Sequence, residues 1–154
     1  DFYNWIRYKW CNGNYNNLTK YCNDSNYGIV DNKTTLELND DAAYSNWGEE
    51  WRMPTKEELY ELVRNCSWTW TNFNNTNGYH VTGPNGNSIF IPAAGEQHQG
   101  RPPHGVGETI SYWSSSIAGR PDIAISIRHN ITPASAWTFT ESRYTGISIR
   151  PVCR

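Results

Sequence analysis

The four cysteines are the residues of this 154-residue chain whose chemistry is most restricted by position. Cys11, Cys22, Cys66 and Cys153 form no C-x-x-C pair, and no histidine pair completes a zinc spacing. We expect a short disulfide between Cys11 and Cys22 and a long one between Cys66 and Cys153, which implies an oxidising compartment. Four reduced thiols in a cytosolic protein are the alternative.

Two further groups of side chains are of types that bind metal ions. His98 and His104 lie in a loop rich in glycine and proline, where we expect ordinary loop histidines. The second group is acidic: Asp31, Glu37, Asp40 and Asp41. Its spacing does not match a calcium loop, and acidic residues at 40–41 are placed to begin a short helix that Gly48 would end. We therefore predict no metal site, with calcium as the lesser alternative.

No catalytic signature is present. The chain lacks G-x-S-x-G, H-E-x-x-H and the P-loop, and nothing nearby would activate a cysteine nucleophile. The net charge is -2 without a basic stripe, which argues against a nucleic-acid partner. No apolar run approaches the roughly 18 residues of a membrane helix. These observations predict a protein that is not an enzyme and has no membrane-spanning segment.

The composition is typical of a folded binding protein. The chain has 18 Asn, 8 Trp and 10 Tyr, whereas disordered chains lack aromatic residues. Tyrosine and tryptophan beside small polar residues are also what binding surfaces use. The length fits one domain over residues 1–154. Residues 1–28 are aromatic and rich in asparagine, and we expect an ordered loop there.

The elements that must position these side chains are predicted from periodicity. Thr55 and Glu58 form a capping box for a helix reaching about Asn65, which has one apolar face: Leu59, Leu62, Val63 and Cys66. Strands are expected around 67–71, 78–82, 88–91, 111–115 and 123–130, with a hairpin turn at 83–86. A helix followed by antiparallel strands is an α+β fold.

Alternation in the C-terminal part predicts two faces for the strand over 123–130. Ile123, Ile125 and Ile127 would point inward, leaving Ser126, Arg128 and Asn130 outward. Ile131 shares the parity of the isoleucines, and the alternation repeats at Trp137 and Phe139 and at Ile147 and Ile149. We expect loop 117–122 and residues 132–145 to lie beside the outward face. The candidate ligand-binding residues are therefore Arg120, Asp122, Ser126, Arg128, Asn130, Thr138, Thr140, Ser142 and Tyr144.

Several motifs together resemble the Fibrobacter succinogenes major paralogous domain family. They are DDAA at 40–43, WG at 47–48, WRMPT at 51–55, GYHVTGPNGNSIFIPAAG at 78–95, YWSSS at 112–116 and GISIRPV at 146–152. The resemblance runs from about Tyr3 to Cys153, and the positions of Cys66 and Cys153 also fit it. It implies a C-type-lectin-like fold and a place among surface proteins and lipoproteins of Bacteroidetes. Family members usually carry a strand and a glycine-rich segment before this start, so we expect a trimmed chain or a neighbouring chain that supplies the strand.

The C-terminal part also resembles the variable region of proteins diversified by retroelements. There, miscopied adenines in AAC codons cannot produce Lys, Gln, Glu, Met or Trp. Residues 1–116 hold 22 of these types, and residues 117–149 hold two, Trp137 and Glu141. A strand-rich tail that uses few long polar residues explains the same depletion.

The resemblance and the binding surface predict a non-enzymatic, extracellular or cell-surface module that binds a protein or a glycan without a cofactor. One alternative is a structural module of a surface appendage or a secreted multidomain protein. A lesser alternative is an enzyme of the formylglycine-generating type, which needs reactive cysteines in a cleft.

Overall fold

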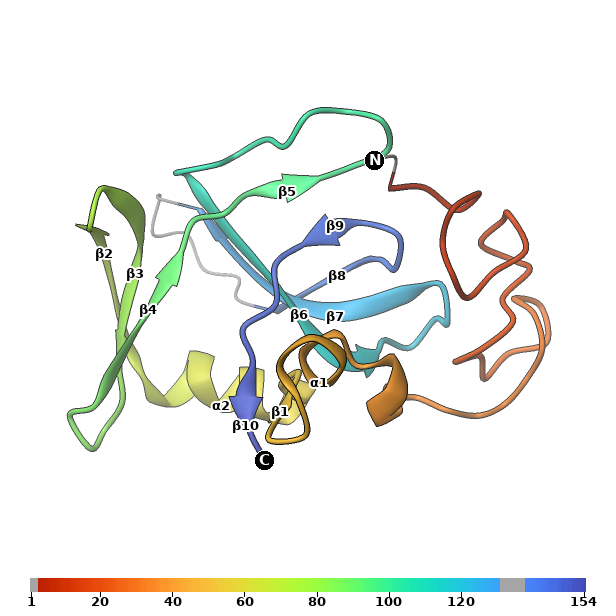
Figure 1. Ribbon diagram of the computed structural model, residues 1–154, viewed down its shortest axis with the longest axis horizontal. Helices are drawn as coiled ribbons and strands as arrows, with labels where there is room; N and C mark the ends of the chain where they lie inside the picture. Colours follow the sequence, from red (N-terminus) through yellow and green to blue (C-terminus); the bar gives the residue numbers. More distant parts are fainter. Residues whose placement is uncertain (1–2, 131–137) are drawn as a thin grey trace.

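The computed structural model describes residues 3–130 and 138–154, and their paired strands form four small antiparallel sheets (Figure 1). The central sheet has the order β6-β7-β8 and the second has the order β2-β3-β4. Two-stranded pairs join β1 to β10 and β5 to β9. The α+β class is therefore confirmed. The strands are β1 (Trp51–Arg52), β2 (Ser67–Phe73), β3 (Thr76–Thr82), β4 (Ser88–Pro92), β5 (Glu96–Gln97), β6 (Thr109–Ile117), β7 (Ile123–Asn130), β8 (Thr138–Ser142), β9 (Gly146–Ile147) and β10 (Val152–Cys153).

The helix α2 (Lys56–Asn65) begins where the sequence predicts it. The Thr55 side chain accepts from the Glu58 amide, and the Glu58 carboxylate accepts from the Thr55 amide, which completes the capping box. The Glu58 carboxylate also pairs with the Arg52 guanidinium through two contacts of 2.6 Å. This pair fixes the start of α2 against β1.

The hydrophobic core lies between α2, the β2-β3-β4 sheet and one face of the central sheet. Leu59 on α2 is buried, and Leu62, Val63 and Cys66 pack against the same cluster, as the predicted apolar face requires. The hairpin β3-β4 turns at 83–86 as predicted and contributes Tyr79 and Ile91. The central sheet supplies Ile110, Tyr112 and Ile127. Cross-strand pairing fixes this register, because a one-residue slip would exchange the two faces.

Two short helical segments precede α2. They are η1 (Leu38–Asp40) and α1 (Ala42–Trp47). Asp41 caps α1 by accepting from the amides of Ala43 and Tyr44, and Gly48 ends it with a φ of 94°. The expected helix start at 40–41 is thus confirmed. Within the described residues, no helix is long and apolar enough to cross a membrane.

The second face of the central sheet is covered at Ser126 and partly open at Phe139, which corrects part of the predicted alternation. Ile125 and Ile127 are buried as predicted, and Ile123 is half-buried. Ser126, expected outward, is only 1% exposed. The register aligns Trp113, Ser126 and Phe139 in one row across the three strands on this face. The prediction failed for Ser126 because alternation shows that two faces differ, not that one of them meets water.

The segment 3–32 is an irregular ordered loop that lies against one end of the central sheet. Figure 1 shows it beside the central sheet, on the side opposite the β2-β3-β4 sheet. Leu18, Tyr21 and Cys22 are fully buried, although the segment contains no helix and only isolated bridges such as Cys11 with Leu18. The expectation of an ordered aromatic loop is confirmed.

The four cysteines are free thiols, so the structure contains neither of the two expected bridges. Cys11 Sγ donates to the Trp5 carbonyl oxygen at 2.9 Å, and Cys22 Sγ donates to the Asp24 carbonyl oxygen at 3.1 Å. Cys66 ends α2 against the core, whereas Cys153 is exposed on β10 opposite Trp51. The four thiols therefore lie in different surroundings, and no two of them are bonded to each other.

Candidate ligand-binding site

A buried arginine, Arg143, attaches the segment 3–32 to the central sheet. Its guanidinium donates to the Tyr8 hydroxyl at 2.9 Å and to the carbonyl oxygens of Tyr21 at 3.1 Å and Lys20 at 3.2 Å. A fourth bond of 2.8 Å reaches the carbonyl oxygen of Pro121, two residues before β7. Hydrogen bonds from a charged donor are about twice as strong as neutral ones. Arg143 thus positions the aromatic side chains of the segment.

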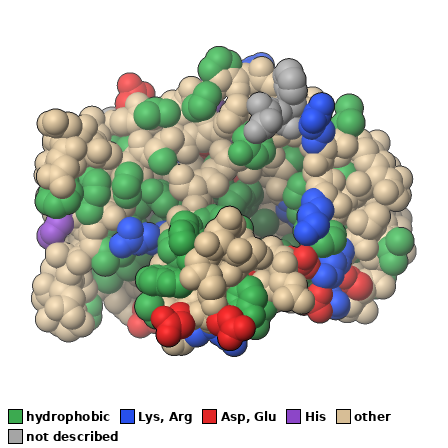
Figure 2. Space-filling view, viewed as in Figure 1, with side chains coloured by type: hydrophobic (Ala, Val, Ile, Leu, Met, Phe, Trp, Pro, Cys, Tyr) green, Lys and Arg blue, Asp and Glu red, His purple; other side chains and the backbone are tan. Residues whose placement is uncertain are grey.

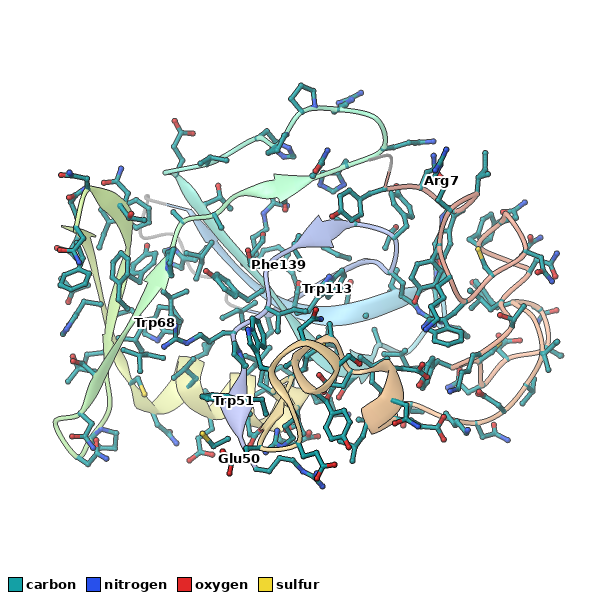
Figure 3. All side chains as sticks on the ribbon, in the orientation of Figure 1. Arg7, Glu50, Trp51, Trp68, Trp113 and Phe139 are labelled. Atoms are coloured by element: carbon teal, nitrogen blue, oxygen red, sulfur yellow. The ribbon has the colours of Figure 1, made fainter. Side chains whose placement is uncertain are left out.

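A pocket of about 220 Å³ lies where this segment meets the covered face, and we call it the aromatic pocket. Figure 2 shows a hollow at this place, beside α1. Trp113 of β6 contributes from the middle of the molecule, where Figure 3 labels it. The aromatic and other apolar lining side chains are Tyr8, Trp10, Tyr21, Leu36, Ala42, Met53, Trp113, Ile117, Ala124 and Ile149. Polar groups come from Ser114, Ser115, Ser116, Lys9, Asp40 and Arg143.

Charged side chains surround one end of the aromatic pocket. Lys20 contacts both Asp40 and Glu37, while Lys9 lies over the Trp10 ring at 4.2 Å and 3.7 Å from the Asp40 carboxylate. Figure 2 shows acidic and basic side chains side by side over this region. The pocket therefore combines aromatic walls with charged groups that can form hydrogen bonds to a ligand.

The titration of these groups is shifted by their surroundings. Burial raises the pKa of Asp40, but hydrogen bonds from Lys20 and Tyr21 outweigh this and lower its pKa below the ordinary value. Burial raises the pKa of Tyr21, and so does its hydrogen bond to Asp40. The pKa of Tyr8 is likewise raised by burial. Asp40 is thus an anion and the two tyrosines are neutral at physiological pH; the Tyr21 hydroxyl donates to Asp40, and the Tyr8 hydroxyl accepts from Arg143. Such a polarised set is typical of functional sites.

The nine residues predicted to bind ligand do not form one face. Arg120 and Asp122 form a two-point ion pair, with Nε–Oδ1 at 3.0 Å and Nη2–Oδ2 at 2.5 Å. Asp122, a candidate in the loop 117–122, is only 4% exposed, and its carboxylate is occupied by Arg120. The Arg120 guanidinium lies over the Tyr27 ring, and the Tyr144 ring meets the Trp5 ring edge-on with 5.2 Å between centroids. These residues border the segment 3–32.

Two predicted residues lie on the opposite side of β8. Thr138 and Thr140 are exposed and line an open recess of about 480 Å³, the β8 recess, with Tyr60 of α2 and loop residues 117–119. Ser142 ends β8 opposite Ile123 and is half-buried. Thr138 and Thr140 are therefore predicted residues that meet solvent, as is Arg120 on the other side of the sheet.

The remaining predictions lie elsewhere. Arg128 is half-buried and pairs with Glu96 through Nη2–Oε1 at 2.7 Å and with Glu141 at 3.5 Å, so it is not free to vary. Asn130 is the last residue of β7, opposite Thr109. Residues 131–137, which include Trp137 and the first part of the predicted stretch 132–145, lie outside the described residues.

The acidic group is engaged in structural contacts. Asp31 accepts from the amides of Tyr21, Cys22 and Lys33, while Glu37 pairs with Lys20 and Lys33. Beyond capping α1, Asp41 also accepts from the Met53 amide at 2.8 Å. These carboxylates face amide and ammonium donors, which agrees with the helix-start and loop roles expected of them.

Sequence reasoning missed the residues that organise both regions. Arg143 lies between two of the predicted binding residues, Ser142 and Tyr144, and Glu96 lies two residues before His98. The Glu96-x-His98 spacing was the available signal, because residues two apart share one face of a strand. Nothing in the sequence indicates that Arg143 reaches residues more than 120 positions away.

Comparison of the chain with known protein families, with curated proteins and with solved structures found no match.

Proposed function

We propose that this protein is a non-enzymatic ligand-binding module, and that the aromatic pocket receives one ring-sized group of a larger protein or glycan ligand. The observation that carries the proposal is an apolar pocket walled by Trp10, Tyr21 and Trp113 with Asp40 and Lys9 at its edge. Concave, mostly apolar sites with a few polar groups are typical of ligand binding.

The size of the pocket limits what it accepts. Sites for whole drug-sized ligands occupy about 300–1,000 Å³. At about 220 Å³ the aromatic pocket is too small for such a ligand, but it has room for one sugar residue or one side chain. Tryptophan and tyrosine provide flat apolar surface at low entropic cost. Asp40 can accept hydrogen bonds from a ligand, and Lys9 can donate them. The rest of the ligand would lie over residues 3–32.

The family resemblance supports the same function. A C-type-lectin-like fold carried by surface proteins and lipoproteins of Bacteroidetes would place the pocket outside the cell, where glycans and proteins are available. Variation by a retroelement would then act mainly at exposed positions of 117–149, such as Thr138 and Thr140. The extracellular location and the variation by a retroelement are both part of the proposal.

A binding screen with matched variants tests the proposal. The protein would be applied to arrays of immobilised glycans and of secreted proteins, together with Trp10→Ala, Lys9→Glu and the control Trp47→Ala. Trp47 is exposed on α1 and does not line the pocket. We expect Trp10→Ala to weaken binding of a ligand by about 2 kcal/mol, roughly thirtyfold, as loss of a central tryptophan does. Ligands bound equally by all three variants would contradict the pocket as the site.

A structural role has one specific observation in its favour. β8 is the outer strand of the central sheet, and Phe139 on it is 38% exposed. Exposed outer strands can pair with another chain. Sedimentation velocity at micromolar concentration distinguishes the two functions, because a monomer that binds a ligand supports the module and self-assembly lost in Phe139→Lys supports the structural role.

A further inference from the structure

Three side chains of metal-binding type converge at the start of the loop 98–104. His104 Nε2 lies 2.9 Å from Glu96 Oε1, and His98 Nε2 lies 3.4 Å from the same oxygen. One candidate ligand atom from each residue lies within 4.8 Å of the other two. Glu96 is buried, His98 is half-buried and His104 is exposed, so the group opens to solvent on the histidine side.

The backbone fixes this arrangement. Glu96 and His104 are direct partners in an antiparallel bridge, with Glu96 N–His104 O at 3.0 Å and His104 N–Glu96 O at 2.9 Å. His98 is two residues from Glu96, so its side chain is on the same face. Gly95 allows the close approach, since a Cβ there would lie 2.3 Å from the His104 carbonyl oxygen. The three side chains are therefore placed by strand pairing and by strand period.

The distances suit a tetrahedral ion. Zn²⁺ bonds to imidazole nitrogen and carboxylate oxygen are about 2.0–2.2 Å long, which puts neighbouring ligand atoms of a tetrahedral ion about 3.3–3.6 Å apart. The separation of 3.4 Å between His98 Nε2 and Glu96 Oε1 falls in this range, and the separation of 2.9 Å at His104 Nε2 would have to widen by about half an ångström. Two histidines and one glutamate with an open fourth position also form a known ligand set for Zn²⁺.

The surroundings orient the carboxylate and also lower its affinity for a cation. Ser111 Oγ donates to Glu96 Oε2 at 3.1 Å, and Arg128 Nη2 lies 2.7 Å from Oε1. A carboxylate has about four lone-pair sites, so Oε1 can accept from Arg128 and still bind an ion. Such outer contacts fix ligand orientation in metal sites. The guanidinium charge opposes a dication, so we expect micromolar rather than tighter affinity.

We propose that Glu96, His98 and His104 bind one Zn²⁺ ion, with water or a donor atom of a ligand in the fourth position. The ion would join β5 to the far end of the loop 98–104 through both histidines. This site is separate from the aromatic pocket, so either proposal can fail without the other. It replaces the expectation that the two histidines are ordinary loop residues.

Titration with Zn²⁺ by isothermal calorimetry tests the site. We expect one ion per chain, and a dissociation constant at least tenfold higher in His98→Ala and in His104→Ala. His80→Ala is the control, because His80 is an exposed histidine on β3 away from the group. Thermal unfolding without metal shows that each variant folds. Binding that is absent, or equal in all four proteins, would overturn the proposal.

Cobalt substitution distinguishes these ligands from the free thiols. With nitrogen and oxygen ligands alone, Co²⁺ gives visible d–d bands without a thiolate charge-transfer band in the near ultraviolet. We expect this spectrum in the native protein and its loss in His104→Ala. A thiolate charge-transfer band would assign the ion to cysteine and contradict the proposal.

Discussion

Ser126 and Ser114 are buried serines of neighbouring strands with different hydrogen bonding. Ser114 Oγ donates to the Ile125 carbonyl oxygen at 2.8 Å and accepts from the Ser116 amide at 3.2 Å. Ser126 Oγ has no hydrogen-bond partner among the described residues. A buried polar group without a partner costs about 1–3 kcal/mol.

This contrast gives a matched pair of variants. Ser126→Ala removes a hydroxyl that makes no bond, so we expect the free energy of unfolding to stay equal or rise by up to about 1 kcal/mol. Ser114→Ala breaks two bonds and leaves a carbonyl and an amide unsatisfied, so we expect a loss of about 1–3 kcal/mol. Denaturant unfolding of both variants measures the difference. A larger loss in Ser126→Ala than in Ser114→Ala would contradict the hydrogen bonding described.

The four free thiols should all be reactive once the protein is unfolded. Under denaturing, non-reducing conditions all four cysteines should react with a thiol reagent, whereas two bridges would leave none. In the native protein Cys153 should react first and Cys22 last, since Cys153 is exposed and Cys22 is buried. Mass spectrometry of the labelled peptides gives both the number and the order. Fewer than four thiols in the denatured, freshly purified protein would show that a bridge forms.

At the scale of single elements, the start of α2 should be sensitive to pH. The hydrogen-bonded Arg52 guanidinium, with help from the Thr55 amide, lowers the pKa of Glu58 to about 2. A carboxyl whose pKa is lower in the folded state stabilises the protein above its unfolded pKa, about 4.3, and loses that contribution as pH falls toward 2.

Glu58→Gln measures this contribution. Because the Glu58 side chain is 38% exposed, solvent screening reduces the effect, and we expect a loss of about 1–2 kcal/mol at pH 7. The difference between native protein and variant should shrink steadily between pH 5 and pH 2. Glu57→Gln, at an exposed position one residue away, is the control and should change stability little. A difference that is constant with pH would contradict the ion pair.

Elements with local signals were predictable from the sequence. The capping box at Thr55, the turn at 83–86 and the alternation of Trp68 and Trp70 each depend on neighbouring residues, and all appear in the structure. The strand over 123–130 was also predicted, but the burial of Ser126 on its second face was not. Whether Ser126 meets water depends on what packs over this face of the sheet, and no local period carries that information.

At the scale of the whole molecule, Arg143 should control the docking of the segment 3–32. Arg143→Leu removes four hydrogen bonds to this segment and to Pro121, and we expect a loss of at least about 3 kcal/mol. Arg150→Leu, at an exposed position, should have little effect. Hydrogen exchange should become faster at Leu18 and Tyr21 in Arg143→Leu. Unchanged protection there would contradict the anchoring role.

Part of the candidate site could be predicted from the sequence. The aromatic richness of residues 1–28 and the tail as a source of binding residues were both visible in the sequence. The contact between these two regions could not be predicted, because it depends on Arg143 and on packing between residues more than 100 positions apart. Charged outward residues such as Arg128 turned out to pair with Glu96, a partner that strand parity alone does not supply.

The most direct test of the central claim follows the tryptophan indole N–H signals by NMR while small probes are added. The probes are single sugars (glucose, galactose, N-acetylglucosamine, fucose and sialic acid) and the amides of phenylalanine and tyrosine. We expect at least one probe to shift the signals of Trp10 and Trp113, to leave Trp47 unshifted, and to lose its effect in Trp10→Ala. If no probe shifts Trp10 or Trp113, or if the shifts persist unchanged in Trp10→Ala, the aromatic pocket is not the ligand site.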